Sequence, residues 1–395
     1  MVSRNFNLFC SILLLKTVVI ISIVYVLFNY SYDRDKRDLS IDPKATRLSN
    51  WTRSHLTHLG RYWKRLTRKN RTETLEKGFT MKHVVNHTKH ESFKKIKKTH
   101  KRKEGRKEVL IFVGIISAPQ LIFRRNAVRR SWLKQCKKKG IPCLFFSDYQ
   151  DMHGNKLPEH IYVPLHQEQL LHGDMILAQS PGGINFARRY LWILNWANVR
   201  YKFKYFLRVD DDYFICVDRL LLELPYRPKK KLYWGHVHCS PPGGIRVDEG
   251  FVIVSNDLAQ RFLREENKTL MCHPYGDQAM SMWINNIPGV TYFGDRRVHH
   301  DLAAEDKMLK YYQDICSNFL ALHGSYPLEI EMFWLNYLNN GSKKKYSIPP
   351  ITYPCGNMDK TFNYMSFAGM YNAKPKPCRN NPTWKIAGFY SGRSG

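Results

Sequence analysis

Three consecutive aspartates, Asp210, Asp211 and Asp212, interrupt an apolar stretch that has the composition of a buried strand. In an extended chain, side chains two positions apart point to the same side, so Asp210 and Asp212 can converge on one object while Asp211 points away. Three carboxylates at the end of a core strand repel one another unless a positive charge lies nearby. Their oxygens suit Mg²⁺ or Mn²⁺, ions that are often shared with substrate phosphates. We therefore expect a metal–phosphate site; the alternative is a solvated acidic turn or a helix N-cap.

A basic segment follows the first apolar strand, which we predict over residues 109–117. Arg125 and Arg129 are four residues apart and share one face of the helix predicted over residues 124–132. A strand, a turn and a basic helix form a natural binding place for a nucleotide diphosphate. A solvent-facing helix would show the same pattern, so both interpretations remain open at this point.

Strands and helices alternate along the chain after residue 108. Apolar runs predict strands at residues 143–147, 161–165, 174–177, 205–215, 232–237 and 250–255. Helices are expected at residues 184–201 and 218–224, after a cap at Asn256 and Asp257, and at residues 278–284. This alternation indicates an α/β domain with a mainly parallel central sheet. Ligands of such sheets gather at the carboxyl ends of strands, where the three aspartates would lie.

The chain has 395 residues and a formal net charge of +30, with 43% hydrophobic residues. It is long enough for one large or two ordinary domains with a real core. Residues 33–108 hold 24 Lys and Arg against nine Asp and Glu, so much of the charge lies in one polar segment. We expect residues 29–107 to be a disordered basic stem, with acidic glycan or lipid binding as the alternative. The chain shows no nucleic-acid-binding motif, so no nucleic-acid partner is expected.

Residues 8–28 are nearly all apolar and have about the length that spans a bilayer. We expect a signal anchor that contains Lys16, preceded by a cytoplasmic tail over residues 1–7; a cleaved signal peptide is the alternative. Five glycosylation sequons follow the apolar segment, which favours a lumenal chain: Asn50, Asn70, Asn86, Asn267 and Asn340. Eight cysteines besides Cys10 are consistent with up to four disulfides in an oxidising compartment.

Four segments, in this order, resemble the β-1,3-galactosyltransferase family, which includes related β-1,3-N-acetylglucosaminyltransferases. They are Arg-Asn-Ala-Val-Arg-Arg-Ser-Trp at 125–132, Val-Asp-Asp-Asp-Tyr-Phe at 209–214, a strand and helix start at 250–258, and a His-containing segment at 322–334. The resemblance covers about residues 108–338. Each segment alone is weak evidence; together they are specific.

The resemblance implies a GT-A-type nucleotide-diphospho-sugar transferase fold over residues 108–342, in a single-pass type II protein of the Golgi membrane. It implies inverting, metal-dependent transfer of a hexose, most simply galactose, from a UDP-sugar to the 3-hydroxyl of an acceptor sugar on a glycoprotein, glycolipid or proteoglycan. By the same resemblance, Asp210, Asp212 and His323 would bind Mn²⁺. Arg125, Arg129, Asp210 and Asp211 would face the UDP donor. A homodimer is left open.

The chain departs from the family at its acidic "E-D-V" motif, where it has Gly276-Asp277-Gln278. Asp277 is then the candidate general base for the acceptor hydroxyl, although an Asp at a helix start is also a common N-cap. Arg189 stands where the family usually has Lys, and residues 241–249 form a shorter loop. Residues 343–395 have no matched counterpart, and Cys355 and Cys378 suggest an extension tied by disulfides.

Two other classes of function remain open. A catalytically silent relative that binds nucleotide sugar or glycan would explain the altered motif at Asp277. A basic polyanion-binding protein would explain the stem, and it would show salt-sensitive binding that survives loss of Asp212.

Overall fold

The structure, a computed structural model, describes residues 105–240, 244–285, 287–340, 346–357 and 373–384. The predicted tail and membrane anchor, and nearly all of the predicted stem, lie outside these ranges. Among the described residues, none of the helices has the length and apolar character needed to cross a membrane.

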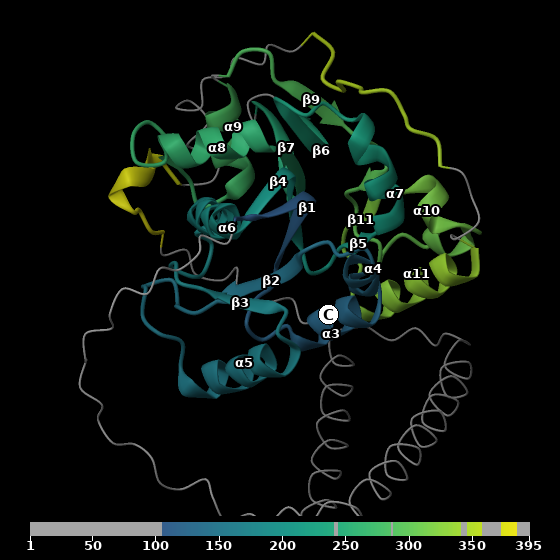
Figure 1. The fold of residues 1–395 in the computed structure, drawn as a ribbon, viewed down its shortest axis with the longest axis horizontal. Coiled ribbons are helices and arrows are strands. Elements are labelled where there is room, and N and C mark those ends of the chain that lie inside the picture. Colours follow the sequence, from purple (N-terminus) through teal and green to yellow (C-terminus); the bar gives the residue numbers. More distant parts are fainter. Residues whose placement is uncertain (1–104, 241–243, 286, 341–345, 358–372, 385–395) are drawn as a thin grey trace, which may run out of the picture. The chain divides into compact units, whose positions relative to one another are not determined.

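A seven-stranded sheet forms the centre of the described domain, with the strand order β3-β2-β1-β4-β7-β6-β9 (Figure 1). Strand β7 is antiparallel to both of its neighbours, and the other neighbouring pairs are parallel. The predicted α/β class and mainly parallel sheet are therefore confirmed. The bounds are β1 Lys107–Ile116, β2 Cys143–Asp148, β3 Met175–Ala178, β4 Tyr201–Asp210, β6 Leu232–Ser240, β7 Gly244–Ser255 and β9 Thr291–Gly294.

Helices cover both faces of this sheet, because its central strands are apolar on both sides. In β1, Ile111, Val113 and Ile115 enter one hydrophobic cluster, and Phe112 and Ile116 enter the other. The first cluster packs on α3 Ile122–Arg130, α4 Leu133–Lys138, α5 Glu159–His172, α7 Val217–Glu223, α10 Ile315–Asn318 and α11 Pro327–Asn340. The second packs on α6 Phe186–Arg200, α8 Asn256–Glu265 and α9 Gly276–Asn285 (Figure 1).

Two small sheets complete the described fold. The first has the order β10-β11-β5, with β10 Val298–His299, β11 Ala321–Leu322 and β5 Phe214–Ile215. The second pairs β8 Met271–Cys272 with β12 Lys376–Pro377. Short 3₁₀ turns lie at η1 Leu224–Tyr226, η2 Leu309–Tyr311 and η4 Cys378–Asn380. The strand predicted over residues 205–215 is thus two strands in different sheets, divided at the aspartates.

The strand predicted over residues 161–165 is wrong, because these residues lie inside helix α5. Only Leu165 of this run is buried, and Val163 is exposed, whereas a strand in a sheet covered on both faces would be buried throughout. Pro164 lies within the helix and removes one backbone hydrogen bond. Glutamate and glutamine residues on both sides of the run favour the helix.

A second correction concerns the start of α8. Its N-cap is Ser255, one residue before the predicted pair. The Asp257 carboxylate instead accepts a hydrogen bond from the backbone N–H of Lys231, at 3.0 Å. Asp257 therefore fastens the helix start to the beginning of β6.

Four disulfides link the eight cysteines that follow Cys10: Cys136–Cys143, Cys216–Cys316, Cys239–Cys355 and Cys272–Cys378. The prediction that Cys355 and Cys378 tie down the C-terminal extension is confirmed. The described parts of this extension also form hydrogen bonds to the domain, for example from Gly294 N to Thr352 O and from Trp384 N to Asn185 Oδ1, both at 2.9 Å. These bonds attach the described parts of the extension to the domain.

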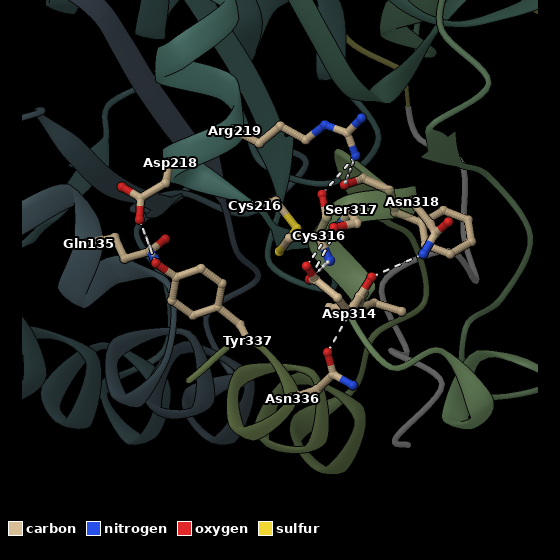
Figure 2. Close-up of a disulfide and its surroundings, with 12 residues drawn as sticks. Gln135, Cys216, Asp218, Arg219, Asp314, Cys316, Ser317, Asn318, Asn336 and Tyr337 are labelled. Carbon is tan, nitrogen blue, oxygen red and sulfur yellow. Dashed lines mark hydrogen bonds between the residues drawn. A yellow bond between two sulfur atoms is a disulfide. The ribbon is translucent and has the colours of Figure 1, made fainter. Parts of the chain in front are cut away.

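The Cys216–Cys316 bridge joins the residue after β5 to α10 (Figure 2). Asp314 caps α10 by accepting hydrogen bonds from the backbone of Cys316 and Ser317, and Arg219 donates to the carbonyl of Cys316 at 2.7 Å. Strand β5 follows the three aspartates and pairs antiparallel with β11, which precedes His323. The bridge therefore holds together the two segments that carry the predicted metal ligands.

Candidate active site

The three aspartates lie at the carboxyl end of β4, as the sequence predicts. The backbone N–H of Asp211 donates to Ile116 O at 3.0 Å, which fixes the turn to the end of β1. The backbone N–H of Ser325 donates to Asp212 O at 2.8 Å. The turn is thus held both by the central sheet and by the segment that contains His323.

Asp212 has the features of a metal ligand. Its Oδ1 atom is buried and has no hydrogen-bond partner among the described residues. Its Oδ2 atom accepts a hydrogen bond from Arg124 at 3.2 Å. A buried carboxylate oxygen without a partner is costly unless a bound cation or donor completes its environment.

Asp211 points into the protein. Its side chain accepts a hydrogen bond from Ser117 Oγ at 2.6 Å and is almost completely buried. Burial and the neighbouring charge of Asp212 raise the pKa of Asp211 to about 7, against the opposing effect of Arg124. These contacts favour a structural role in the turn, and its predicted role toward the donor nucleotide remains a prediction.

Asp210 lies beside the buried guanidinium of Arg208, whose Nη2 is 3.0 Å from Asp210 Oδ1. Burial raises the pKa of Asp210 to about 6; Arg208 opposes the rise and the charge of Asp212 adds to it. A divalent cation bound between Asp210 and Asp212 would stabilise both in the ionised form. Without such a cation, the positive charge near the aspartates is too small to stabilise all of their carboxylates in the ionised form.

The His323 ring is held in one orientation by a hydrogen bond to the backbone. Its Nδ1 lies 2.7 Å from the backbone carbonyl of His300, and because a carbonyl oxygen only accepts, Nδ1 carries the proton. The Nε2 atom of the neutral ring is then left with a lone pair. The ring packs against Tyr213, the residue after Asp212, with 5.1 Å between ring centroids. Two carboxylates and one imidazole form a donor set that suits Mn²⁺. Among the described residues, however, the ligand atoms of these three side chains do not form a group within 4.8 Å of one another, so Mn²⁺ binding by them remains a prediction.

Arg125 and Arg129 are engaged within the protein. Both bind the carboxylate of Glu168, and Arg129 also binds Asp174, with an Nη2–Oδ1 distance of 2.8 Å. Arg125 donates further hydrogen bonds to Ser117 Oγ and to the carbonyls of Ala118 and Pro119. We call Arg125, Arg129, Glu168 and Asp174 the arginine network. Its contacts favour a structural role, and donor binding by its arginines remains a prediction.

The sequence reasoning missed two residues of this region. Glu168 lies in α5, part of which was predicted as a strand, so its position beside α3 was not foreseen. Burial would raise the pKa of Glu168, but hydrogen bonds and charges from Arg125 and Arg129 outweigh this and lower it. Arg124, which immediately precedes the predicted arginines, contacts Asp211 and Asp212. The four-residue spacing showed that Arg125 and Arg129 share one face of the helix. It did not show that Arg124, on a different face, is the arginine that contacts the aspartates.

Asp277 lies in the first turn of α9, where its Oδ2 accepts a hydrogen bond from Arg246 Nε at 2.7 Å. Its Oδ1 accepts a hydrogen bond from the backbone N–H of Gln278 at 2.7 Å. Because α9 begins at Gly276, Asp277 lies within the first turn and is not the predicted N-cap. Burial raises the pKa of Asp277 against the lowering effect of Arg246. A carboxyl with a raised pKa is a better proton acceptor, so these contacts are compatible with the predicted base role, which remains a prediction.

Glu249 occupies the space next to Gly276, where the family motif has a glutamate. Glu249 Oε2 accepts a hydrogen bond from Gly276 N at 2.8 Å, and a Cβ at Gly276 would lie 2.2 Å from that oxygen. Burial raises the pKa of Glu249 well above its usual range; Arg208 opposes the rise, and Asp277 adds to it. A carboxylate from β7 thus fills the position that the glycine leaves empty.

The chain departs from the family pattern at two further places, Arg189 and the loop over residues 241–249. Arg189 is buried in α6, with Nη2 at 2.8 Å from both Asp148 Oδ1 and the carbonyl of Gly183. The described part of the loop over residues 241–249 belongs to β7 and carries Arg246, Asp248 and Glu249 into the site region. Asp248 accepts a hydrogen bond from the backbone N–H of Gly250 at 2.8 Å.

Comparison with known proteins finds galactosyltransferases among the relatives of this chain. Residues 123–243 match the family model described as galactosyltransferase. The chain is 31% identical over 135 residues to mouse "Beta-1,3-galactosyltransferase 6", an alignment that covers 33% of this chain and 41% of the relative. It is 24% identical over 252 residues to the Arabidopsis thaliana "Hydroxyproline O-galactosyltransferase GALT6", over 58% of this chain and 35% of the relative. The resemblance to the β-1,3-galactosyltransferase family is therefore confirmed.

The chain spans less than half the length of the curated relatives that it matches. Among solved structures, it is similar to a glycosyltransferase involved in the glycosylation of the major capsid of PBCV-1, with a TM-score of 0.32 and 17% identity over 57% of this chain and 98% of that chain. A likeness of this size carries no argument about function.

Proposed function

We propose that the chain is a metal-dependent, inverting β-1,3-hexosyltransferase with a GT-A-type fold, and that it transfers galactose from UDP-galactose to an acceptor sugar. The observation that supports this most directly is the buried Oδ1 of Asp212, which has no hydrogen-bond partner among the described residues. The His323 ring packs on Tyr213, the residue after Asp212, and its Nδ1 is engaged by the His300 carbonyl, which leaves Nε2 for a ligand. The match to the galactosyltransferase model, which contains Asp212, supports the donor class.

In the proposed reaction, Asp277 removes the proton from the acceptor 3-hydroxyl, and that oxygen attacks the anomeric carbon of the donor sugar. The bond from this carbon to the UDP oxygen breaks, and its electron pair leaves with UDP, so the configuration inverts. Mn²⁺ held by Asp210, Asp212 and His323 would neutralise the diphosphate as charge develops on it. Arg124 adds positive charge beside Asp212.

We further propose that the acceptor is a glycan on a protein or lipid and that the protein is a type II component of the Golgi membrane. The sequons, the four disulfides and the apolar residues 8–28 support a lumenal domain with a membrane anchor.

The proposal is tested by measuring UDP release by the full-length chain in detergent. UDP-galactose, UDP-N-acetylglucosamine and UDP-N-acetylgalactosamine are offered with Mn²⁺ and a panel of sugar acceptors. We expect turnover with UDP-galactose that is abolished by EDTA and reduced about a hundredfold or more by Asp212→Asn. Turnover that survives Asp212→Asn would reject the proposed metal site.

The second candidate is a catalytically silent relative that binds nucleotide sugar, which the replacement of the family glutamate by Gly276 favours. It predicts Mn²⁺-dependent binding of UDP without turnover of any donor. Turnover that is lost in Asp277→Asn would exclude it.

A further inference from the structure

Three histidines that the proposed reaction does not use form a compact cluster at the edge of the candidate active site. His236 and His238 lie two positions apart on β6, and His300 follows β10. One nitrogen atom from each ring can be chosen so that all three lie within 4.8 Å of one another. The ring centroids are 4.4 Å apart for His236 and His300, 5.0 Å for His236 and His238, and 4.8 Å for His238 and His300.

A carboxylate completes this cluster. Asp248 Oδ2, from β7, lies 3.1 Å from His238 Nε2 and 3.8 Å from His300 Nδ1. The Nδ1 atom of His300 is buried and makes no hydrogen bond among the described residues. Three imidazoles and one carboxylate therefore face one small volume, and at least one ring nitrogen lacks a hydrogen-bond partner there.

Packing alone is a poor explanation for this arrangement. Apolar side chains would fill the same space without bringing several polar nitrogens together. The histidine side chains are half-buried, so a small ion can still reach them from solvent. We propose that His236, His238 and His300 bind Zn²⁺, with Asp248 as the carboxylate that contacts two of these histidines. Three imidazoles with one open or carboxylate position are a donor set that zinc accepts, whereas Mn²⁺ and Mg²⁺ prefer oxygen-rich sets.

The zinc site is distinct from the proposed Mn²⁺ site but is connected to it. The ring of His300 stacks on the ring of His323, with 5.6 Å between centroids. The backbone carbonyl of His300 accepts the hydrogen bond that fixes the His323 ring. Zinc on the His300 ring would therefore hold in place the carbonyl that orients a ligand of the second ion.

The test is titration of Zn²⁺ into the metal-depleted full-length chain in detergent, with a chromophoric chelator as competitor. We expect one tightly bound Zn²⁺ in the unaltered protein. In the double variant His238→Phe/His300→Phe, which keeps aromatic rings in the cluster, we expect this binding to be lost. Asp248→Asn should weaken it about 10–100-fold, the usual effect of removing a carboxylate partner of a metal-bound histidine.

Two control variants show whether the bound Zn²⁺ occupies the histidine cluster. The N-terminal region also contains histidines, so His83→Gln/His90→Gln serves as the matched control and should leave the tight site unchanged. Asp212→Asn should reduce turnover about a hundredfold or more but leave Zn²⁺ binding intact, so failure of the proposed function and failure of the zinc site are distinguishable.

Thermal unfolding gives a second readout. Zn²⁺ should raise the Tm of the unaltered protein, because a ligand of the folded state stabilises it, and it should not raise the Tm of the His238→Phe/His300→Phe variant. Without metal, the two proteins should unfold at similar temperatures. Absence of tight Zn²⁺ binding, or equal binding in the double variant, would overturn the proposal and leave the cluster as a packing feature.

Discussion

Two charged regions lie on either side of Ser117, at the carboxyl end of β1, and they differ in how their charges are balanced. In the arginine network, two guanidinium groups face two carboxylates at distances of 2.5–3.2 Å, and every member is buried or nearly so. The exposed Lys137 adds one further contact at the edge of the network, 3.4 Å from Asp174. In the second region, which we call the acidic edge, five carboxylates face two guanidinium groups, those of Arg124 and Arg208. The members of the acidic edge are Asp210, Asp211, Asp212, Asp248 and Glu249.

This difference separates structural charges from functional ones. A balanced buried network needs no ligand, and removing one of its members leaves an unpaired charge. An unbalanced acidic region is costly to the folded protein, and the cost is recovered when cations bind. We therefore expect substitutions in the network to reduce stability and substitutions at or beside the acidic edge to reduce activity.

The largest expected effect is on turnover, from Asp277→Asn. Asparagine can still accept the hydrogen bond from the backbone N–H of Gln278, so the first turn of α9 keeps this contact, but it cannot take a proton. Turnover should fall about 10²–10⁴-fold while the unfolding temperature changes little. Asp257→Asn, which alters the first turn of α8 instead, is the control and should leave turnover unchanged. Retained activity in Asp277→Asn would leave Asp277 with a structural role only, as the partner of Arg246.

The next effect is on stability, from Glu168→Gln. It removes the charge that both Arg125 and Arg129 contact and should lower the free energy of unfolding by about 3 kcal/mol. Chemical denaturation measures this change. Glu331→Gln breaks the exposed pair with Arg130 and should cost less than about 1 kcal/mol. Equal effects of the two substitutions would contradict the distinction between a buried network and surface pairs.

A smaller effect is expected from moving the carboxylate between Glu249 and Gly276. Glu249→Ala should lower turnover about tenfold, within the usual range for a residue that supports a catalytic group. Adding Gly276→Glu to Glu249→Ala should recover part of this loss, because the new carboxylate enters the space that Glu249 occupied. Gly276→Glu alone should be harmful, since its side chain meets Glu249. If the double variant is no better than Glu249→Ala, the two positions do not exchange this role.

The smallest effect concerns the pH profile. Arg246 lowers the pKa of Asp277, so Arg246→Met should raise this pKa further. A base acts only when deprotonated, so turnover at low pH should begin to fail at a higher pH than in the unaltered protein. Initial rates between pH 5 and pH 8 would show this shift. An unmoved acid limb would argue that Asp277 does not take the proton.

The sequence predicts those parts of the fold whose residues form a distinctive local pattern. Strands β1 and β4 are long apolar runs, and Asp210–Asp212 stand out because such runs are rarely followed by three carboxylates. The direction of β7 was not predictable, because an apolar strand looks the same in a parallel and in an antiparallel pairing. Helix α5 was missed in part because the short run at 161–165 contains two β-branched residues, Ile161 and Val163, which favour strands.

The residues of the candidate site were predictable where a single sequence motif contains them. They were not predictable where the fold brings together elements that are distant in the sequence. Asp212, His323 and Asp277 lie within recognisable segments. Glu249, on β7, fills the space that a side chain at Gly276 in α9 would occupy. No sequence spacing links the two positions. The pair His236 and His238 was readable as an i, i+2 pattern on one strand, but its third member, His300, is brought close only by the tertiary fold.

The Cys216–Cys316 bridge also bears on when the site can be assembled. It closes a loop across a sequence separation of 100 residues, between the segment after Asp212 and the segment before His323. Loop closure of this length is worth about 4–5 kcal/mol in the chain-entropy model, a large share of the stability of an ordinary domain. A chain kept reduced would have to bring the two sides of the metal site together without this help. Formation of the Cys216–Cys316 disulfide during biosynthesis is thus coupled to the assembly of the candidate metal site. An oxidising compartment would therefore favour the folded form of this site.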